Sequence, residues 1–397
     1  MTASTAHPAT TTKAQRRWLA NLLLATGSLL LCLLILELGV RLFVDVDGPG
    51  PIAVYDVDLS TRIAFLPGRE RLYETPEFRY TLKTNRFGRR DREWSDAELA
   101  DEGNLLFVGD SFVMGASVED EESIPTRLEA WTKAKGTPRE VFNFGMPVTG
   151  IPQYVRILED ALRIGVKART VLIGVFVGND FEPGLLEPVD ALPPVAAAPP
   201  RFAPHSLLLD VLRRRVSQSS LLVGWMLQLG DWLGVRLYNT NNSYIFLRNP
   251  PPDQIETFDR FLDKLREIQE ICERHGRDLY IVVFPNKIQV ENHESLSTSV
   301  YDTERPNRRI AEYCASQGLR CFDQLAVLSD TYAREGRPLY FPVDRHLNQM
   351  GNRIAADSIA ASLERAHALA PNPRPQQRPE TAAEKAARTI RSARQRS

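Results

Sequence analysis

Residues 104–112 read Asn-Leu-Leu-Phe-Val-Gly-Asp-Ser-Phe, a short apolar run that stops at Gly-Asp-Ser. An amphipathic stretch follows at residues 123–135. Together they predict a strand, a loop and a helix. Because a strand followed by a crossover helix normally pairs in parallel with the next strand, this unit is typical of an α/β sheet.

The same unit recurs along the chain. Further strands are predicted at 140–144, 170–177, 279–284 and 319–322, and further helices at 152–165, 253–275, 302–317 and from residue 348. Residues 170–177 are almost continuously apolar, which suits a strand buried on both faces. The alternation predicts a three-layer α/β/α domain over residues 104–367, with a mainly parallel sheet of five strands. Residues 45–103 form a connecting region.

Composition excludes several classes of protein. The 397 residues are 43% hydrophobic and 25% charged, so the chain is neither disordered throughout nor a multi-span membrane protein. The 49 basic and 50 acidic residues leave a net charge of -1, and we expect no nucleic-acid partner. The four cysteines show no metal-ligand spacing, so we expect no metal and no cofactor. Cys314 and Cys321 are either two buried thiols or a pair that forms in an oxidising compartment.

The first hydrophobic segment predicts the compartment. Residues 18–44 are apolar over a length sufficient to cross a bilayer as one helix. Basic residues precede this segment and acidic residues follow it, so residues 1–17 are expected in the cytoplasm and the rest outside, in the periplasm or at the cell surface. A cleaved signal peptide is the alternative, but the run is long for one and no A-x-A site closes it.

Two further segments interrupt the α/β pattern. An insertion at 181–249 is rich in proline and then carries apolar positions that could form amphipathic helices. Such helices could pack on the domain, cover a site or rest on a bilayer. Residues 368–397 combine proline with a basic Ala/Arg stretch and are predicted to be a disordered tail.

Three predicted strands end in residues that can take part in chemistry. Ser111 follows the first strand and supplies a hydroxyl, and Gly145 follows the second, where a missing Cβ lets a backbone N–H approach a ligand. Asn179 follows the third and supplies a side-chain amide. Because ligands bind at the carboxyl ends of parallel strands, we expect these groups at one edge of the sheet.

A serine nucleophile needs a base, and His346 is the best placed of the six histidines. It follows the last predicted strand and precedes the last helix. Asp344, two residues upstream, could hold the imidazole in one tautomer. The other histidines lie before the predicted anchor, in the insertion, in a loop or at helix ends.

The set Gly109-Asp110-Ser111, Gly145, Asn179 and Asp344-x-His346 resembles the four sequence blocks of the SGNH (GDSL-type) hydrolases, in order and spacing. The likeness covers residues 84–363. Its flanks are similar to a membrane-anchored bacterial branch, with an N-x-x-G-x-R element at 85–90 and Pro-Asn-Lys at 285–287. One departure is the aspartate, which many members place three residues before the histidine; the spacing of two looks like that of the alginate O-acetylation proteins.

The resemblance implies a flavodoxin-like SGNH fold in which Ser111 is the nucleophile, His346 the base and Asp344 its partner. The Ser111 and Gly145 amides and the Asn179 side chain would form the oxyanion hole. The implied activity is that of an outward-facing, membrane-anchored serine esterase or O-acyltransferase acting on acyl, above all acetyl, esters of surface carbohydrate. An inactive subunit of an envelope polysaccharide complex and a lipase remain alternatives.

Overall fold

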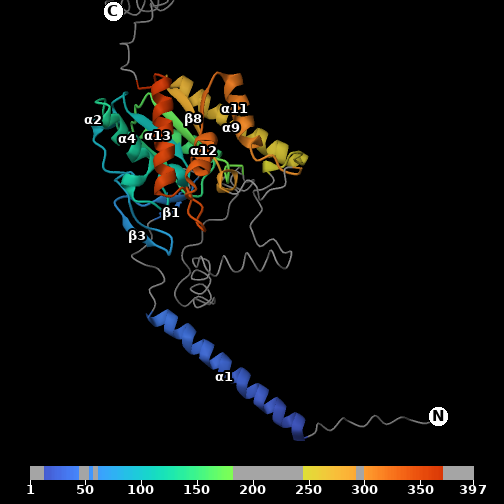
Figure 1. Ribbon diagram of the computed structural model, residues 1–397. Coiled ribbons are helices and arrows are strands. Elements are labelled where there is room, and N and C mark those ends of the chain that lie inside the picture. The colour runs from blue at the N-terminus through green and yellow to red at the C-terminus, as the bar shows by residue number, and fades with distance from the viewer. Residues whose placement is uncertain (1–12, 44–52, 57–60, 182–244, 292–298, 370–397) are drawn as a thin grey trace, which may run out of the picture. The chain divides into compact units, whose positions relative to one another are not determined.

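The computed structural model describes residues 13–43, 53–56, 61–181, 245–291 and 299–369 (Figure 1). The chain divides into two compact units, one containing helix α1 (Lys13–Phe43) and the other the β-sheet with its helices. Most of the insertion expected at 181–249 and of the tail expected at 368–397 lies outside the described residues.

The centre of the second unit is a five-stranded parallel sheet in the order β6-β5-β7-β8-β9. Its strands are β5 (Leu105–Gly109), β6 (Val141–Gly145), β7 (Thr170–Phe176), β8 (Asp278–Phe284) and β9 (Arg320–Asp323). Both β5 and β6 are buried along their whole length. They run in register from Leu105↔Val141 to Gly109↔Gly145, so the residues that follow them start level with one another.

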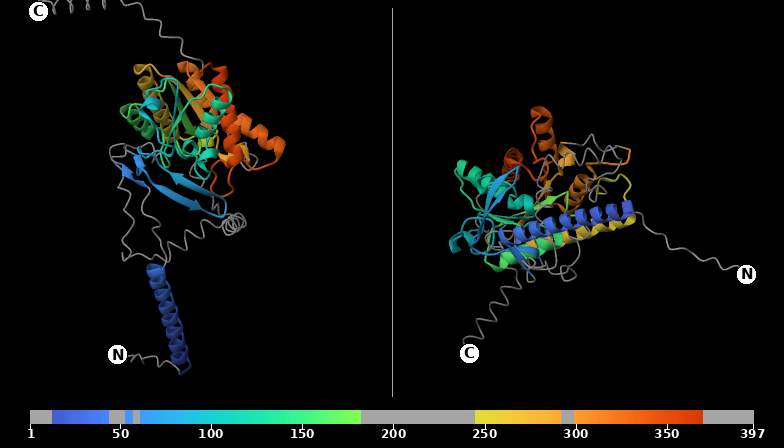
Figure 2. Two further views of the ribbon diagram at one scale, coloured as in Figure 1. Left: turned by 90° about the vertical axis from the view of Figure 1, so that its left-hand side faces the viewer. Right: turned by 90° about the horizontal axis from the view of Figure 1, so that it is seen from below.

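Helices cover both faces of this sheet, as Figures 1 and 2 show, and the predicted α/β/α architecture is confirmed. One layer contains α4 (Ile124–Ala134), α12 (Leu325–Glu335) and α13 (Gln349–Arg365), and the other contains α5 (Ile151–Arg163), α9 (Pro252–Arg274) and α11 (Arg305–Gln317). In the first layer, Leu128 and Ile359 pack with Phe107 and Val282 of the sheet in one buried cluster. This buried core holds the strands in place and therefore sets the position of the edge at which they end.

The segment that precedes β5 is more structured than a connecting region. It contains two antiparallel hairpins, β1 (Ala53–Asp56) with β2 (Thr61–Phe65) and β3 (Glu70–Glu74) with β4 (Arg79–Lys83), and the short helix α2 (Asp96–Leu99). Tyr80 and Leu82 of β4 are buried, so this hairpin packs on the domain with one face. Alternation over only five residues is a weak signal in a sequence, which is why the hairpins were not predicted.

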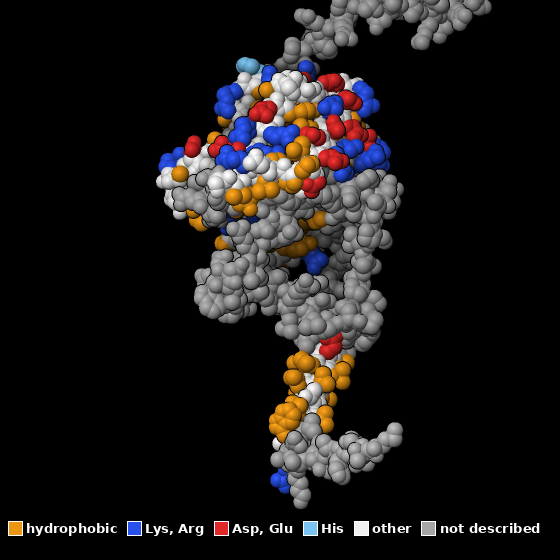
Figure 3. Space-filling view, turned by 90° about the vertical axis from the view of Figure 1, so that its right-hand side faces the viewer, with side chains coloured by type: hydrophobic (Ala, Val, Ile, Leu, Met, Phe, Trp, Pro, Cys, Tyr) orange, Lys and Arg blue, Asp and Glu red, His pale blue; other side chains and the backbone are white. Residues whose placement is uncertain are grey.

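Helix α1 is the one described helix long and apolar enough to cross a membrane. Its residues Ala20–Gly39 have a mean hydropathy of 2.3, and the leucines within this range are exposed. Figure 3 shows hydrophobic side chains over its described part, while the described surface of the second unit on this face mixes acidic and basic side chains. The predicted apolar helix is therefore present; a signal sequence would satisfy the same criteria.

Candidate active site

Ser111 lies where β5 ends and the short helix α3 (Ser111–Met114) begins. Asp110 caps this helix, its Oδ1 accepting the Phe112 N–H at 2.9 Å. A Cβ on Gly109 would come within 2.4 Å of Val113, so the tight strand-to-helix turn needs glycine there. The turn brings the Ser111 hydroxyl to the carboxyl edge of the sheet in a nearly buried position.

His346 meets Ser111 across this edge. The His346 Nε2 atom is 2.8 Å from Ser111 Oγ, and His346 Nδ1 is 2.7 Å from Asp344 Oδ1. The imidazole packs on the Phe112 ring, with 5.2 Å between ring centroids. The structure thus brings together the hydroxyl, imidazole and carboxylate that the sequence placed at opposite ends of the domain.

The segment that carries Asp344 and His346 is held at several points. The Phe341 N–H donates to the His346 carbonyl, and Lys287 Nζ donates to the Phe341 and Pro342 carbonyls at 3.2 Å each. Lys287 belongs to the Pro-Asn-Lys element noted in the sequence and begins helix α10 (Lys287–Val290). This element therefore supports the histidine segment from the end of β8.

The ionisation of the pair follows from these contacts. Burial lowers the pKa of His346, but the hydrogen bond and charge of Asp344, with the charge of Asp110, outweigh it and leave the pKa above its ordinary value. Burial raises the pKa of Asp344, but hydrogen bonds from His346 and Ser117 outweigh it and leave the pKa below its ordinary value. A carboxylate beside an imidazole that readily accepts a proton is the arrangement general-base chemistry requires.

The Asn179 side chain is hydrogen-bonded to Asp110, the residue before Ser111. Asn179 follows β7. Burial raises the pKa of Asp110 to about 6, and the interaction with the Asn179 side chain opposes this shift by favouring the ionised carboxylate. The Asn179 Oδ1 atom is buried and makes no hydrogen bond within the described part of the chain. The next residue, Asp180, is bound instead to the Tyr154 hydroxyl and the Phe176 N–H, both at 2.9 Å, and so serves the turn.

Gly145 differs from its expected role. Its N–H donates to Asn143 Oδ1 at 3.0 Å, so it is not the bare donor that the sequence suggested. A Cβ at this position would come within 2.0 Å of the Met114 backbone nitrogen. Glycine is required here because β6 and α3 approach each other closely, a packing reason that sequence alone does not separate from a catalytic one.

Backbone strain gathers around the same edge. Four described non-glycine residues have positive φ, and three of them follow β5, follow β6 or separate Asp344 from His346: Ser117, Val148 and Arg345. Such conformations cost about 1–3 kcal/mol each and persist where the surroundings impose them, which is common at active sites. Ser117, whose hydroxyl reaches Asp344, was not predicted, because nothing in its sequence context distinguishes it from a turn serine.

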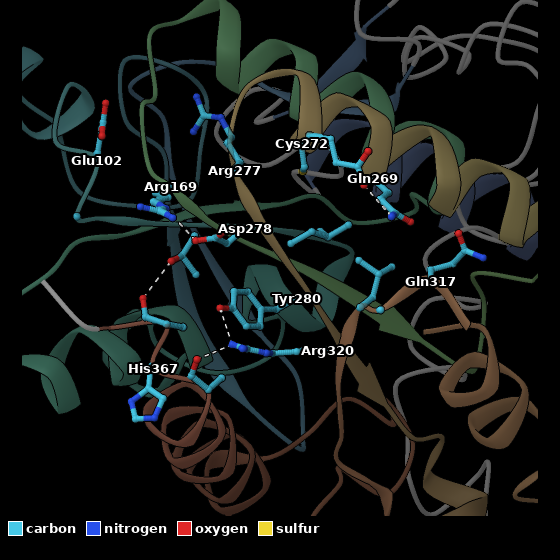
Figure 4. A pocket seen from close by; sticks show the side chains of 18 of the residues that line it. Glu102, Arg169, Gln269, Cys272, Arg277, Asp278, Tyr280, Gln317, Arg320 and His367 are labelled. Atoms are coloured by element: carbon cyan, nitrogen blue, oxygen red, sulfur yellow. Dashed lines mark hydrogen bonds and ion pairs between the residues drawn. The ribbon is translucent and has the colours of Figure 1, made fainter. Parts of the chain in front are cut away.

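A pocket of about 530 Å³ lies at the opposite, amino-terminal edge of the sheet (Figure 4). Its arginines are bound mainly to backbone carbonyls: Arg277 donates to the Val166 carbonyl at 2.6 Å, and Arg320 donates to the Ala366 carbonyl at the end of α13. Burial raises the pKa of the Cys272 thiol in this pocket to about 12, so the thiol stays protonated. These contacts close helix ends and offer no nucleophile.

Cys314 and Cys321 are free thiols whose side chains are hydrogen-bonded to each other. Within the described ranges no group of three or more His, Cys, Asp or Glu side chains could hold a metal ion.

One family model matches part of the chain. Residues 246–392, which include Asp344 and His346, match the family model of the SGNH hydrolase-like domain of the acetyltransferase AlgX. None of the curated proteins matches the chain.

Solved structures similar to the chain include a lipolytic protein of the G-D-S-L family from Desulfitobacterium hafniense DCB-2, at 12% identity and a TM-score of 0.37, covering 66% of this chain and 99% of that one. The acetyl xylan esterase AlAXEase (14%, 0.39, 66% and 99%) and a carbohydrate acetylesterase family member from Sinorhizobium meliloti (13%, 0.36, 66% and 97%) are also similar. Likeness this low does not align individual residues. The family match over residues 246–392, the sheet order and the Gly-Asp-Ser turn confirm the resemblance to the SGNH (GDSL-type) hydrolases, with likeness to AlgX, and support an ester hydrolase or acyltransferase.

Proposed function

We propose that this protein is a membrane-anchored serine esterase or O-acyltransferase that faces outward and handles acetyl esters of surface carbohydrate. The observation that carries the proposal is the chain of contacts from Ser111 Oγ through His346 to Asp344, at 2.8 and 2.7 Å. An inactive subunit of a polysaccharide complex would not need this arrangement. The contacts therefore favour an active enzyme.

The reaction follows from where charge develops. His346 Nε2 takes the proton of Ser111 as Oγ attacks the ester carbonyl, and Asp344 stabilises the imidazolium that forms. The carbonyl oxygen becomes an oxyanion, to which the Ser111 N–H and the Asn179 amide donate. The alcohol leaves with the proton from His346. Water or a sugar hydroxyl then loses a proton to His346 as it attacks the acyl carbon, and Ser111 Oγ leaves with that proton from His346. The Gly145 N–H donates to Asn143 Oδ1 in the structure and would have to leave that acceptor to join the oxyanion hole.

The substrate and the compartment rest on other features. The matching family model describes an acetyltransferase, which favours a short acyl group over the long chain of a lipase substrate. The apolar α1, with Lys13, Arg16 and Arg17 at its start, favours a single span with the amino terminus in the cytoplasm. A domain held outside the membrane in this way meets envelope glycans rather than cytoplasmic metabolites.

The decisive test uses the full chain purified in detergent. We expect it to hydrolyse p-nitrophenyl acetate in preference to the octanoate and palmitate esters, and to be labelled by a fluorophosphonate probe. Ser111→Ala should lower the rate about 10⁴–10⁶-fold and abolish labelling. Ser95→Ala is the matched control, since Ser95 only caps α2. Equal turnover by Ser111→Ala and wild type would refute the proposal.

Two further measurements address the finer points. Release or transfer of acetate on acetylated polysaccharide, followed by NMR, distinguishes a hydrolase from a transferase. Protease digestion of spheroplasts, before and after their membrane is permeabilised, tests orientation: the sheet domain should be cleaved before permeabilisation. A clear preference for palmitate esters would instead support the lipase alternative.

A further inference from the structure

The Oδ1 atom of Asp344 accepts hydrogen bonds from two side chains. It accepts from His346 Nδ1 at 2.7 Å and from the hydroxyl of Ser117 at 2.8 Å. Ser117 lies 227 residues away in the sequence, in the loop that follows α3. The Asp344 side chain is 25% exposed, so packing alone does not hold it.

Ser117 is held in a conformation that serine rarely adopts. Its φ is +69°, in the left-handed region. Its backbone also hydrogen-bonds to Tyr80 of β4. A serine kept at positive φ, with its hydroxyl on a carboxylate beside the histidine, is stabilised by its surroundings rather than by its own preference.

The surroundings that impose this conformation centre on Arg90. Its guanidinium donates to the carbonyls of Met114, Gly115 and Val118, so it binds the loop on both sides of Ser117. Arg90 is 1% exposed and lies over the Tyr80 ring, 4.9 Å from its centroid. It is the last residue of the N-x-x-G-x-R element. Because these hydrogen bonds all go to one loop, the buried arginine holds the backbone of that loop in place.

We propose that Ser117, held by Arg90, is a positioning residue that sets the carboxylate of Asp344 and through it the orientation and basicity of His346. The inference rests on the proposed function, because it gives Ser117 a task only if His346 acts as the base. It assigns the N-x-x-G-x-R element to the active site although Arg90 touches none of the reacting atoms. Ser117 would make up for the loose packing of an aspartate only two residues from its histidine.

The expected signature lies in kcat and in the pH profile. The charged or titratable groups facing His346 are Asp344 and Asp110, and Tyr80 faces Asp344. Without the Ser117 hydroxyl, Asp344 keeps only the bonds from His346 among those described, so its carboxylate is less tightly oriented and the imidazole loses part of the interaction that raises its pKa. We expect kcat to fall about 10- to 100-fold, as for the loss of one hydrogen bond to a charged group. KM should change less than about twofold, and the acid limb of kcat/KM should move to lower pH.

Two variants of the full chain in detergent distinguish the effect of losing the Ser117 hydroxyl from the effect of losing stability. Ser117→Ala and Ser117→Gly both remove the hydroxyl, but only glycine accepts positive φ without strain, so Gly should unfold at a higher temperature than Ala. A positioning role predicts equal losses of kcat and equal shifts of the acid limb in the two variants. A structural role predicts that activity follows the melting temperature and that the limb stays in place, which would overturn the inference.

A readout independent of turnover keeps this test separate from that of the proposed function. The His346 Nδ1 proton, bound to Asp344, should give a low-field proton NMR signal in the wild type that weakens or shifts upfield in both variants. If the wild type hydrolyses no ester and reacts with no fluorophosphonate, the proposed function fails while this signal still tests the contact. An unchanged signal in Ser117→Gly would refute the positioning role.

Discussion

Replacing Asp344 by Asn tests the base and its partner together. The change removes a negative charge 2.7 Å from His346 Nδ1 but leaves an oxygen that can accept the same hydrogen bond, and Ser117 can still donate to that oxygen. The imidazolium formed in the transition state therefore loses a charged partner and keeps a neutral one. A hydrogen bond to a charged group is worth about 1.5–3 kcal/mol, which corresponds to about a 10- to 150-fold loss of kcat.

The pH profile shows in which direction the pKa of His346 changes. Asp344 is a main cause of the raised pKa of His346, so in Asp344→Asn the acid limb of kcat/KM should move to lower pH than in the wild type. The assay is p-nitrophenyl acetate hydrolysis from pH 5 to 9 by the full chain, with fluorophosphonate labelling to show that Ser111 is intact. Wild-type kcat with an unmoved limb would mean that another group orients His346. A loss as large as that of Ser111→Ala would mean that the asparagine holds the wrong tautomer.

Three other changes follow from the contacts. Asn179→Ala should lower kcat about 10²–10³-fold at unchanged melting temperature, and unaltered kinetics would remove Asn179 from the oxyanion hole. Gly145→Ala should lower the free energy of unfolding by about 3 kcal/mol, because its Cβ would lie 2.0 Å from the Met114 nitrogen. The melting temperature should then fall by roughly 6–12 °C. A variant as stable as the wild type would contradict the packing role. Burial and the nearby charge of Asp91 raise the pKa of Glu129 to about 9 from an ordinary 4.5, so its contribution to stability is complete below about pH 4.5 and lost as the pH rises through 9. Glu129→Gln should flatten the fall of melting temperature between pH 6 and 9.5, and an equally steep fall would show that other groups cause it.

The sheet could be predicted because each of its strands carries a strong local signal. Residues 170–177 are apolar almost without a break, and β7 occupies Thr170–Phe176. The parallel arrangement then follows from the helices between the strands. The same rule places Ser111 at the carboxyl edge, but His346 lies between α12 and α13 rather than directly after a strand, so its approach to that edge does not follow from the rule. What could not be predicted is the register of short, weakly patterned segments, such as β3 and β4, and the extra helix α12.

Contacts made by common turn residues could not be predicted either. Gly145 and Ser117 are residue types found in many turns, and their tasks depend on neighbours far away in the sequence. Gly145 proves to be needed by the α3 backbone, and Ser117 by a carboxylate at the other end of the domain. Residue type indicates what a group can do, whereas its actual partner is fixed only by the packing of the whole domain.

The spacing of Asp344 and His346 illustrates how packing can replace a motif. The intervening Arg345 has a φ of +69°, so the backbone turns sharply between the two side chains and both meet through Nδ1 and Oδ1. A turn of this kind is strained for arginine, and the hydrogen bonds of Lys287 to the carbonyls of Phe341 and Pro342 hold the segment that contains it. The Ser117 hydroxyl donates to the same oxygen of the carboxylate. Chemistry requires only the positions of three atoms, so a spacing of two residues can serve as well as three where other parts of the fold impose the turn.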